Sequence, residues 1–306
     1  MFGERPQRTF KEAATRYLKE NLNKRSINDE LMHINQLNPF IGNLALEQIH
    51  VGTLQAFVNH RKKKGVKNRS VNLALGVVRH ILNIAASEWL NEHGLTWLHS
   101  APKIIMLSLN DAAKPYPLSW EEQKAPFSSL PNHLAVMALF KVNTGTREQE
   151  VCQLQWKWEY RVPEICTSVF IVPGNSVKNG EDRVIVLNSV ARSIVDTQRG
   201  KHEKYVFPYK ENPIGKMNNS GWKMAWKKAE LPHNDQYKRG VHNLKHTFGR
   251  RLRAAGVSHE DRQVLLGHRN GSITTHYSAP EIENLINAAN KVCEERRELT
   301  LLKVVS

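Results

Sequence analysis

The chain has 306 residues, 40% hydrophobic and 24% charged, a composition that excludes a wholly disordered protein and a length that predicts two domains. It has no uninterrupted apolar run of about 18 residues, no apolar signal-peptide core and no CxxC pair, which excludes a membrane-spanning, secreted or disulfide-framed protein. The net charge of +15, from 44 Lys and Arg against 29 Asp and Glu, indicates a polyanionic partner, unless the protein is basic and binds nothing specific.

Residues 1–105 predict a small all-helical domain. Thr9 and Glu12 have the spacing of a capping box, and apolar residues at helical spacing follow them. Residues 106–118 belong to a stretch with several prolines and no sustained period, so we expect them to form a linker. The expected helices of this first domain are residues 9–21, 27–37, 53–64 and 70–90.

Residues 119–306 predict a second domain that is mostly helical. Its expected helices are residues 119–128, 131–142, 147–155, 189–199, 217–230, 241–255, 258–266 and 280–298. Two β-rich runs, 168–172 and 183–187, are separated by Pro-Gly and Asn-Gly turn signals and predict a hairpin. The predicted fold class is therefore mainly α with a small antiparallel β-sheet.

Several common catalytic motifs are missing from the sequence. It contains no GxxxxGK[ST] phosphate loop, no GxGxxG and no acidic cluster, which argues against a nucleotide-driven motor, a dinucleotide enzyme and a two-metal nuclease. His242 and His246 have the i, i+4 spacing of a zinc pair, but Asn243 replaces the Glu of HExxH and no further ligand lies nearby. We therefore expect neither a metal nor a cofactor.

The segment 143–156 has features of a phosphate-binding helix start. We expect Thr146 to cap a helix that begins at Arg147, because this places a guanidinium and free backbone N–H groups at the positive end of the helix. Glu150, three residues after Arg147, either supports Arg147 or begins a solvent-facing turn.

Two later segments add further groups that can bind phosphate. The segment 241–256 places three basic side chains on one helical face, by i, i+3, i+4 spacing: His242, Lys245 and His246. His246 is either a core histidine or a phosphate ligand. In the segment 264–277, His268 follows a glycine, and Tyr277 comes nine residues later.

These segments, in this order, resemble the tyrosine recombinase (phage integrase) family over roughly residues 117–280. The family's motifs are an Arg-x-x-Glu helix start, a His-x-Leu-Arg-His element, Leu-Gly-His and a following Tyr. The matching residues are Arg147 with Glu150, His242 to His246, Leu266 to His268, and Tyr277. The predicted N-terminal helical domain resembles the core-binding (SAM-like) domain of the family in its pattern.

The resemblance implies a site-specific DNA recombinase that cuts and rejoins duplex DNA through a 3′-phosphotyrosyl intermediate, without metal or ATP. Tyr277 is then the nucleophile that attacks the scissile phosphate. Arg147 and Lys245 hold its non-bridging oxygens, and His242 and His268 add hydrogen bonds. Lys178, between the two predicted strands, matches the family's general-acid lysine.

The resemblance also implies a biological setting. The expected partners are double-stranded attachment-site DNA and further copies of the chain in a synaptic tetramer. Accessory DNA-bending or directionality proteins are compatible with this role, but no sequence feature points to them. The expected role is integration or excision of a prophage or other mobile element, by a cytoplasmic protein of bacterial or phage origin. A resolvase, an inversion recombinase and a topoisomerase-like enzyme are alternatives with the same chemistry.

One position departs from the family pattern: Lys245 stands where the family has Arg. A guanidinium grips two phosphate oxygens with a planar fork, whereas an ammonium is a point charge. Three interpretations follow: a subgroup that works with Lys, a slower enzyme, or a DNA-binding regulator that is impaired in cleavage.

Two other features have both a functional and a structural interpretation. A basic run either contacts DNA phosphates or is a solvated helix end; it comprises Arg61, Lys62, Lys63, Lys64, Lys67 and Arg69. The C-terminal helix and tail, residues 280–306, have an apolar face that needs a burial site. This face either packs on its own domain or docks onto a neighbouring protomer.

Overall fold

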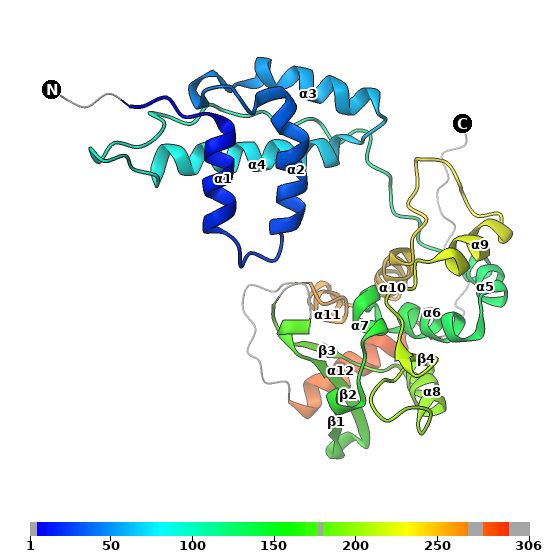
Figure 1. The fold of residues 1–306 in the computed structure, drawn as a ribbon. Helices are drawn as coiled ribbons and strands as arrows, with labels where there is room; N and C mark the ends of the chain where they lie inside the picture. The colour runs from blue at the N-terminus through cyan, green and yellow to red at the C-terminus, as the bar shows by residue number, and fades with distance from the viewer. Residues whose placement is uncertain (1–4, 177–179, 269–277, 294–306) are drawn as a thin grey trace. The chain divides into compact units, whose positions relative to one another are not determined.

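The computed structural model describes residues 5–176, 180–268 and 278–293 (Figure 1). The chain divides into two compact units, Met1–Ala112 and Ala113–Ser306, and each unit has its own hydrophobic core. The expected domain limits, 1–105 and 119–306 with a linker at 106–118, stay a prediction. The predicted fold class, mainly α with a small antiparallel sheet, is confirmed.

The described part of the first unit, from residue 5 onward, contains four α-helices: α1 (Phe10–Glu20), α2 (Ile27–Ile41), α3 (Val51–Lys63) and α4 (Asn68–Ser87). A short 3₁₀ helix, Leu46–Gln48, connects α2 to α3. The predicted capping box begins α1: the Glu12 N–H donates to the Thr9 hydroxyl, and the Thr9 N–H donates to the Glu12 carboxylate. Because apolar residues recur at helical spacing, all four helices contribute to one core, which includes Phe10, Tyr17, Leu37, Phe57 and Val78.

Helix α4 is the one helix in the described ranges that is long and apolar enough to cross a membrane. Most of its apolar residues, however, lie on a side that is buried in the core of the first unit, whereas Leu73 is exposed. Val71, Leu75 and Val78 are at most 2% exposed. Burial of this kind is typical of the central helix of a globular domain.

The second unit is mostly helical and contains a small three-stranded sheet (Figure 1). The helices are α5 (Trp120–Ser129), α6 (Asn132–Thr144), α7 (Glu148–Cys152), α8 (Ser189–Gln198), α9 (Ser220–Lys228), α10 (His242–Ala254), α11 (His259–Leu265) and α12 (Ala279–Asn290). Short 3₁₀ helices occur at Trp156–Trp158, Pro163–Ile165 and Gly174–Ser176. Helix α6 packs against both α8 and α10, so it lies at the centre of this unit.

The sheet is antiparallel, with the order β1 (Glu159–Val162), β2 (Thr167–Val172) and β3 (Arg183–Ile185). Phe170 of β2 pairs with Glu159 on one side and Ile185 on the other. The sequence predicted β2 and β3 but missed β1, because only one residue of β1 is buried and no apolar alternation marks it. It also missed a two-stranded ribbon of β4 (Pro208–Tyr209) and β5 (Asn212–Pro213).

The apolar face of α12 packs within its own unit. Ile282, Leu285 and Ala289 are buried in a cluster that also contains Phe248 and Leu252 of α10. For this helix, packing on its own domain is therefore the observed arrangement, and the helix ends at Asn290 instead of continuing to residue 298. The tail beyond it, residues 294–306, lies outside the described residues.

Candidate active site

Arg147 is the N-cap residue of α7, and its backbone and side chain are both held by Glu150. Gly145, in the left-handed conformation at φ 61°, ends α6 and turns the chain toward this cap. The Arg147 N–H donates to Glu150 Oε2 at 2.7 Å, and Arg147 Nη1 donates to Oε1 at 2.8 Å. The expectation that Thr146 caps the helix is wrong: its buried hydroxyl lies 3.0 Å from the Thr144 hydroxyl instead.

Glu150 is 3% exposed and contacts two arginines, so it is not a solvent-facing residue. One carboxylate oxygen accepts from Arg147, and the other also accepts from Arg183 of β3. Burial alone would raise the pKa of Glu150, but the charge of Arg183 and the hydrogen bonds from Arg147 hold that pKa below its ordinary value. The carboxylate therefore stays charged at neutral pH and fixes both guanidinium groups.

Arg183 is a residue that the sequence reasoning missed. Its guanidinium is buried, and Nη2 lies 3.2 Å from both the Gly145 and the Leu265 carbonyl oxygens. Burial lowers its pKa to about 10, which still leaves the side chain protonated at neutral pH. The only local signal was an Arg at the start of an apolar strand, which does not distinguish this residue from any strand-end arginine.

Helix α10 carries the predicted basic face. His242 begins the helix, and the rings of His242 and His246 meet edge to face with their centroids 4.9 Å apart. Lys245 is 5% exposed, and its ammonium donates to the Leu266 carbonyl oxygen. Burial, reinforced by the charges of Arg183 and Arg147, lowers the pKa of Lys245 to about 6.

His242, Lys245, His246 and His268 line one pocket of about 400 Å³. Burial, followed by the charge of Lys141, lowers the pKa of His242 to about 4. Burial also lowers the pKa values of His246 and His268. The imidazoles are therefore neutral at pH 7, which leaves each ring one nitrogen that can accept a hydrogen bond.

The structure brings most of the predicted site residues together. Arg147 is bonded to the residue next to His268: its Nη2 donates to the Gly267 carbonyl oxygen at 2.7 Å. His268 Nδ1 lies 3.1 Å from Gln263 Oε1, which holds its ring beside α11. The two remaining predicted residues, Lys178 and Tyr277, lie outside the described residues.

A buried lysine that the sequence reasoning did not single out lies beneath this site. Lys141 of α6 is fully buried, and its ammonium donates to the Thr146 carbonyl oxygen. Burial lowers its pKa to about 7. Lys141 therefore braces the turn that carries Arg147.

Metal binding finds no support in the parts of the chain that the structure describes. Within these parts, no three or more His, Cys, Asp or Glu side chains gather in a group that could hold a metal ion. His242 and His246, which have the spacing of a zinc pair, form an aromatic contact and line the same pocket as Lys245.

Some residues of the predicted basic run line a groove of the first unit, and others lie outside it. Arg61 and Arg69 line a groove of about 1060 Å³ that α2 and α4 form with neighbouring loops, and Lys24 and Arg79 also line it. Three lysines at the end of α3, Lys62, Lys63 and Lys64, are exposed, and Lys67 is half-buried.

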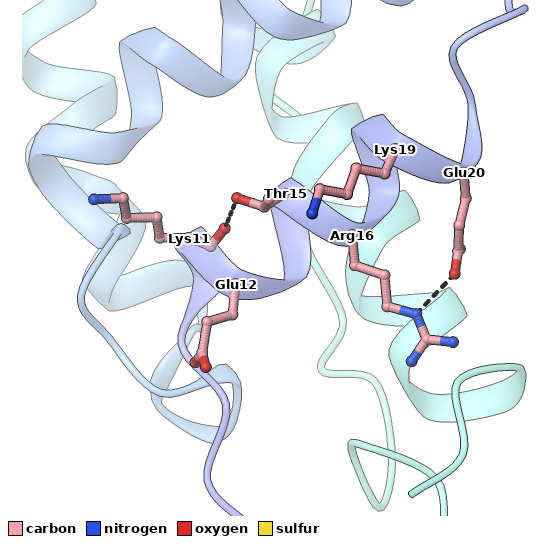
Figure 2. Close-up of a pocket in the computed structure, with 6 residues that line it drawn as sticks. All are labelled: Lys11, Glu12, Thr15, Arg16, Lys19 and Glu20. Atoms are coloured by element: carbon pink, nitrogen blue, oxygen red, sulfur yellow. Dashed lines mark hydrogen bonds and ion pairs between the residues drawn. The ribbon is translucent and has the colours of Figure 1, made fainter.

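A shallower hollow of the first unit lies on the exposed face of α1 (Figure 2). Lys11, Thr15 and Lys19 follow one another along the helix there, and Arg16 bonds to Glu20 with Nε 2.7 Å from Oε1. Arg16 also lies over the Trp97 ring, 4.7 Å from its centroid. In this hollow acidic residues alternate with basic ones, and the larger groove between α2 and α4 also contains two acidic residues, Asp29 and Glu30.

A lysine and three histidines line the pocket beside α10, and next to it Arg147 is bonded to the buried pair of Glu150 and Arg183. The phage integrase family profile matches residues 109–284, which is more than half of the chain. The chain therefore belongs to the phage integrase family, whose members are site-specific tyrosine recombinases.

Individual relatives are similar along most of the chain. The integrase of Salmonella phage P22 is 23% identical over 331 residues, which cover 95% of this chain and 81% of the phage protein. The tyrosine recombinase XerA of Thermococcus kodakarensis is 26% identical, covering 77% of this chain and 79% of the archaeal one.

Solved structures with the same fold include DNA complexes. A lambda integrase dimer bound to a COC′ core site superimposes with a TM-score of 0.68 at 16% identity, over 97% of this chain and 81% of that one. The Tn1549 transposon integrase in complex with transposon right-end DNA gives a TM-score of 0.63 at 15% identity, over 92% and 94% of the two chains. These likenesses establish the fold of the chain.

Proposed function

We propose that this chain is the integrase of a prophage or other mobile element, and that the pocket beside α10 binds the scissile phosphate of its attachment site. One observation carries the proposal: Lys245, His242 and His268 line the same pocket, and Arg147 is bonded to the residue next to His268. The phage relative and the transposon integrase of the same fold support the mobile-element role.

The chemistry follows from the charge that develops at phosphorus. The Tyr277 oxygen forms a bond to phosphorus, and the bond from phosphorus to the 5′ oxygen breaks, which leaves a 3′-phosphotyrosyl link. The pentavalent transition state carries extra negative charge on its non-bridging oxygens, so fixed cations accelerate the step. Arg147 supplies a fork of donors. Lys245, whose pKa of about 6 leaves it mostly neutral in the free protein at pH 7, supplies a compact charge once phosphate binds, because a nearby negative charge favours the protonated form.

Two protons move in this step. The phenol proton of Tyr277 goes to His242, whose neutral imidazole can accept it. The leaving 5′ oxygen takes a proton from Lys178, in the segment between β2 and β3. A 5′-hydroxyl of another strand then reverses the step, so the energy of the broken bond is kept and ATP is not needed.

The first unit supplies a second DNA-contacting surface in this proposal. Arg61, Arg69 and Arg79 line its groove, and the lysines at the end of α3 extend the positive charge at its surface. Cations of this kind bind phosphates without reading the base sequence. The acidic residues Asp29 and Glu30 also line the groove and limit how closely the backbone can approach there.

Assembly and setting complete the proposal. Each of the two recombining sites has two strands to be cut, so four copies of the chain act in one synaptic complex. The related lambda integrase has been solved as a tetramer bound to a Holliday junction. The protein works in the cytoplasm on chromosomal DNA, together with accessory DNA-bending or directionality proteins.

Covalent capture tests the proposal. Nicked duplexes tiled across the DNA that flanks the gene are incubated with the protein, and adducts are sought on a denaturing gel. An integrase gives adducts at one site, and Tyr277→Phe abolishes them. Binding with no adduct on any duplex contradicts the proposal and favours a DNA-binding regulator. Relaxation of any supercoiled plasmid without a defined site favours a topoisomerase-like enzyme.

A further inference from the structure

Three cationic side chains converge on three consecutive carbonyl groups at the end of α11. The Leu265 oxygen accepts from Arg183 at 3.2 Å, the Leu266 oxygen accepts from Lys245, and the Gly267 oxygen accepts from Arg147 at 2.7 Å. The next residue along the chain is His268. We call residues 265–267 the carbonyl turn.

The carbonyl turn joins elements that are far apart in the sequence. The last carbonyl groups of a helix have no partner within the helix and carry partial negative charge, so cations bind there favourably. Here the cations come from β3, from α10 and from the start of α7. Gly267 has a φ of +57°, the left-handed conformation that ends a helix and turns its carbonyl groups outward.

Of these three side chains, Arg183 is buried and also contacts Glu150, the residue that holds Arg147. Unlike Lys245, Arg183 does not line the α10 pocket, and its guanidinium is bonded to protein acceptors, so it is not placed to contact a DNA phosphate. Its guanidinium contacts Glu150, which in turn holds Arg147, and it also contacts the carbonyl oxygens of Gly145 and Leu265. A single side chain therefore connects the cap of α7 to the carbonyl turn.

We infer that Arg183 is a positioning residue for DNA cleavage: it holds Glu150 and the carbonyl turn in one arrangement, so that Arg147, Lys245 and His268 face the same phosphate. This inference rests on the proposed function of the pocket. The planar fork of an arginine reaches a carboxylate and two carbonyl groups at once, whereas a lysine reaches fewer acceptors from one nitrogen.

The packing around Arg183 fits this role. A methyl group at position 267 would lie 2.7 Å from the Arg183 guanidinium, so the glycine lets the turn approach the arginine closely. Glu150 is the carboxylate whose charge compensates the buried guanidinium.

The test compares Arg183→Met and Arg183→Lys with Arg192→Met. Arg192 of α8 is a matched control, because it too bonds to backbone and hydroxyl oxygens, those of Ser168 and Thr167, away from the pocket. Each variant is assayed for adduct formation on the nicked duplex that gives an adduct with the wild-type protein, called the captured duplex. The same assay is repeated on this duplex with a neutral methylphosphonate at the scissile position. Thermal melting and DNA affinity are measured in parallel.

If Arg183 positions the phosphate-binding cation, Arg183→Met lowers cleavage of the ordinary duplex by about tenfold or more. The loss shrinks on the neutral duplex, because a transition state with less charge depends less on Arg147; Arg147→Ala, assayed alongside, is expected to show the same pattern. DNA affinity stays within about threefold, since Arg183 does not reach DNA. Arg192→Met lowers the melting temperature without this charge-selective loss.

The opposite results overturn the inference. Cleavage at the wild-type rate, or an equal loss on both duplexes, means that Arg183 only stabilises the fold. If Arg183→Met does not fold, Arg183→Lys decides by the same two outcomes, since it retains the buried charge. Absence of adduct with the wild-type protein contradicts the proposed function itself, and so is distinguishable from failure of the inference.

Discussion

Lys245 and Leu266 are joined by a hydrogen bond from the lysine ammonium to the leucine carbonyl oxygen, across 21 residues of sequence. This bond fixes the lysine that replaces the family's second arginine at the edge of the pocket that also contains His242 and His268. One of its three N–H groups is used by the carbonyl, so two remain for phosphate oxygens. The replacement therefore keeps a cation at the site when phosphate is bound, because the phosphate charge favours the protonated lysine, and loses the bidentate geometry of an arginine.

Removing this cation should abolish most cleavage and leave DNA binding intact. We expect Lys245→Ala to lower the cleavage rate by about 10²–10³-fold, the usual cost of removing one group that stabilises transition-state charge. Lys245→Arg should keep cleavage within about tenfold of the wild type, because a guanidinium supplies the same charge. Adduct formation on a nicked duplex measures both. Wild-type cleavage by Lys245→Ala would show that the lysine does not contact the phosphate.

The buried position of Lys245 should make stability depend on pH. Its folded-state pKa is about 6, because of burial and then the charges of Arg183 and Arg147, whereas the unfolded chain has the ordinary pKa of about 10.4. Between these values the unfolded chain binds more protons, so the free energy of unfolding rises with pH. The stabilisation is complete above pH 10 and is lost as pH falls toward 6.

Denaturant titrations of the wild type and Lys245→Met at pH 7 and pH 9 measure this effect. Lys141, with a pKa of about 7, contributes in the same direction in both proteins, and the pKa of His242 lies below this window. We expect the wild type to gain more stability over this range than the variant, by on the order of 1 kcal/mol per pH unit. An equal gain in the free energy of unfolding from pH 7 to pH 9 in both proteins would mean that Lys245 is already protonated in the folded protein.

Gly267 should not tolerate a side chain. An alanine there has the strain of a left-handed residue, roughly 1–2 kcal/mol, and its methyl group also meets the Arg183 guanidinium. Gly256 is the control, because its φ is +71° but a methyl group would meet nothing within 4 Å. We expect Gly256→Ala to lose stability alone and Gly267→Ala to lose cleavage as well. Equal effects in both variants would show that the approach of Arg183 to the turn is not needed.

Short motifs explain why most of the site could be predicted from the sequence. Arg147, His268 and the α10 residues each lie in a segment whose spacing carries local information, such as i, i+3, i+4 on a helix. Arg183 could not be found in this way, because the residues that it contacts, Glu150 and Leu265, are separated from it by 33 and 82 positions in the sequence. Its function depends on the folded sheet and not on any neighbouring residue.

The fold shows the same division between local and distant information. Helical periods predicted α1 and α4 because each has a continuous apolar face. The start of α7 was placed at the wrong residue, because the carboxylate of Glu150 provides the cap interaction and no threonine is needed. Strand β1 was missed because its pairing with β2 exists only in the folded sheet.

The groove of the first unit should contribute to DNA affinity through its cations. Arg69 and Arg79 of α4 line the groove, whereas Lys19 lies on the exposed face of α1 near Glu20 (Figure 2). We expect Arg69→Ala and Arg79→Ala each to weaken binding of a duplex and to reduce the slope of affinity against salt by about one unit per lost phosphate contact. Lys19→Ala removes the same charge and should leave both quantities close to the wild type.

Fluorescence anisotropy with the captured duplex, between about 50 and 200 mM salt, distinguishes these variants. A salt slope that falls equally for Lys19→Ala and Arg69→Ala would mean that only the net charge of the protein matters. A slope that falls for the groove variants alone assigns the phosphates to the surface between α2 and α4. Because Arg69 and Arg79 are not part of the α10 pocket, the bound fraction that remains should still form the covalent adduct at the wild-type rate.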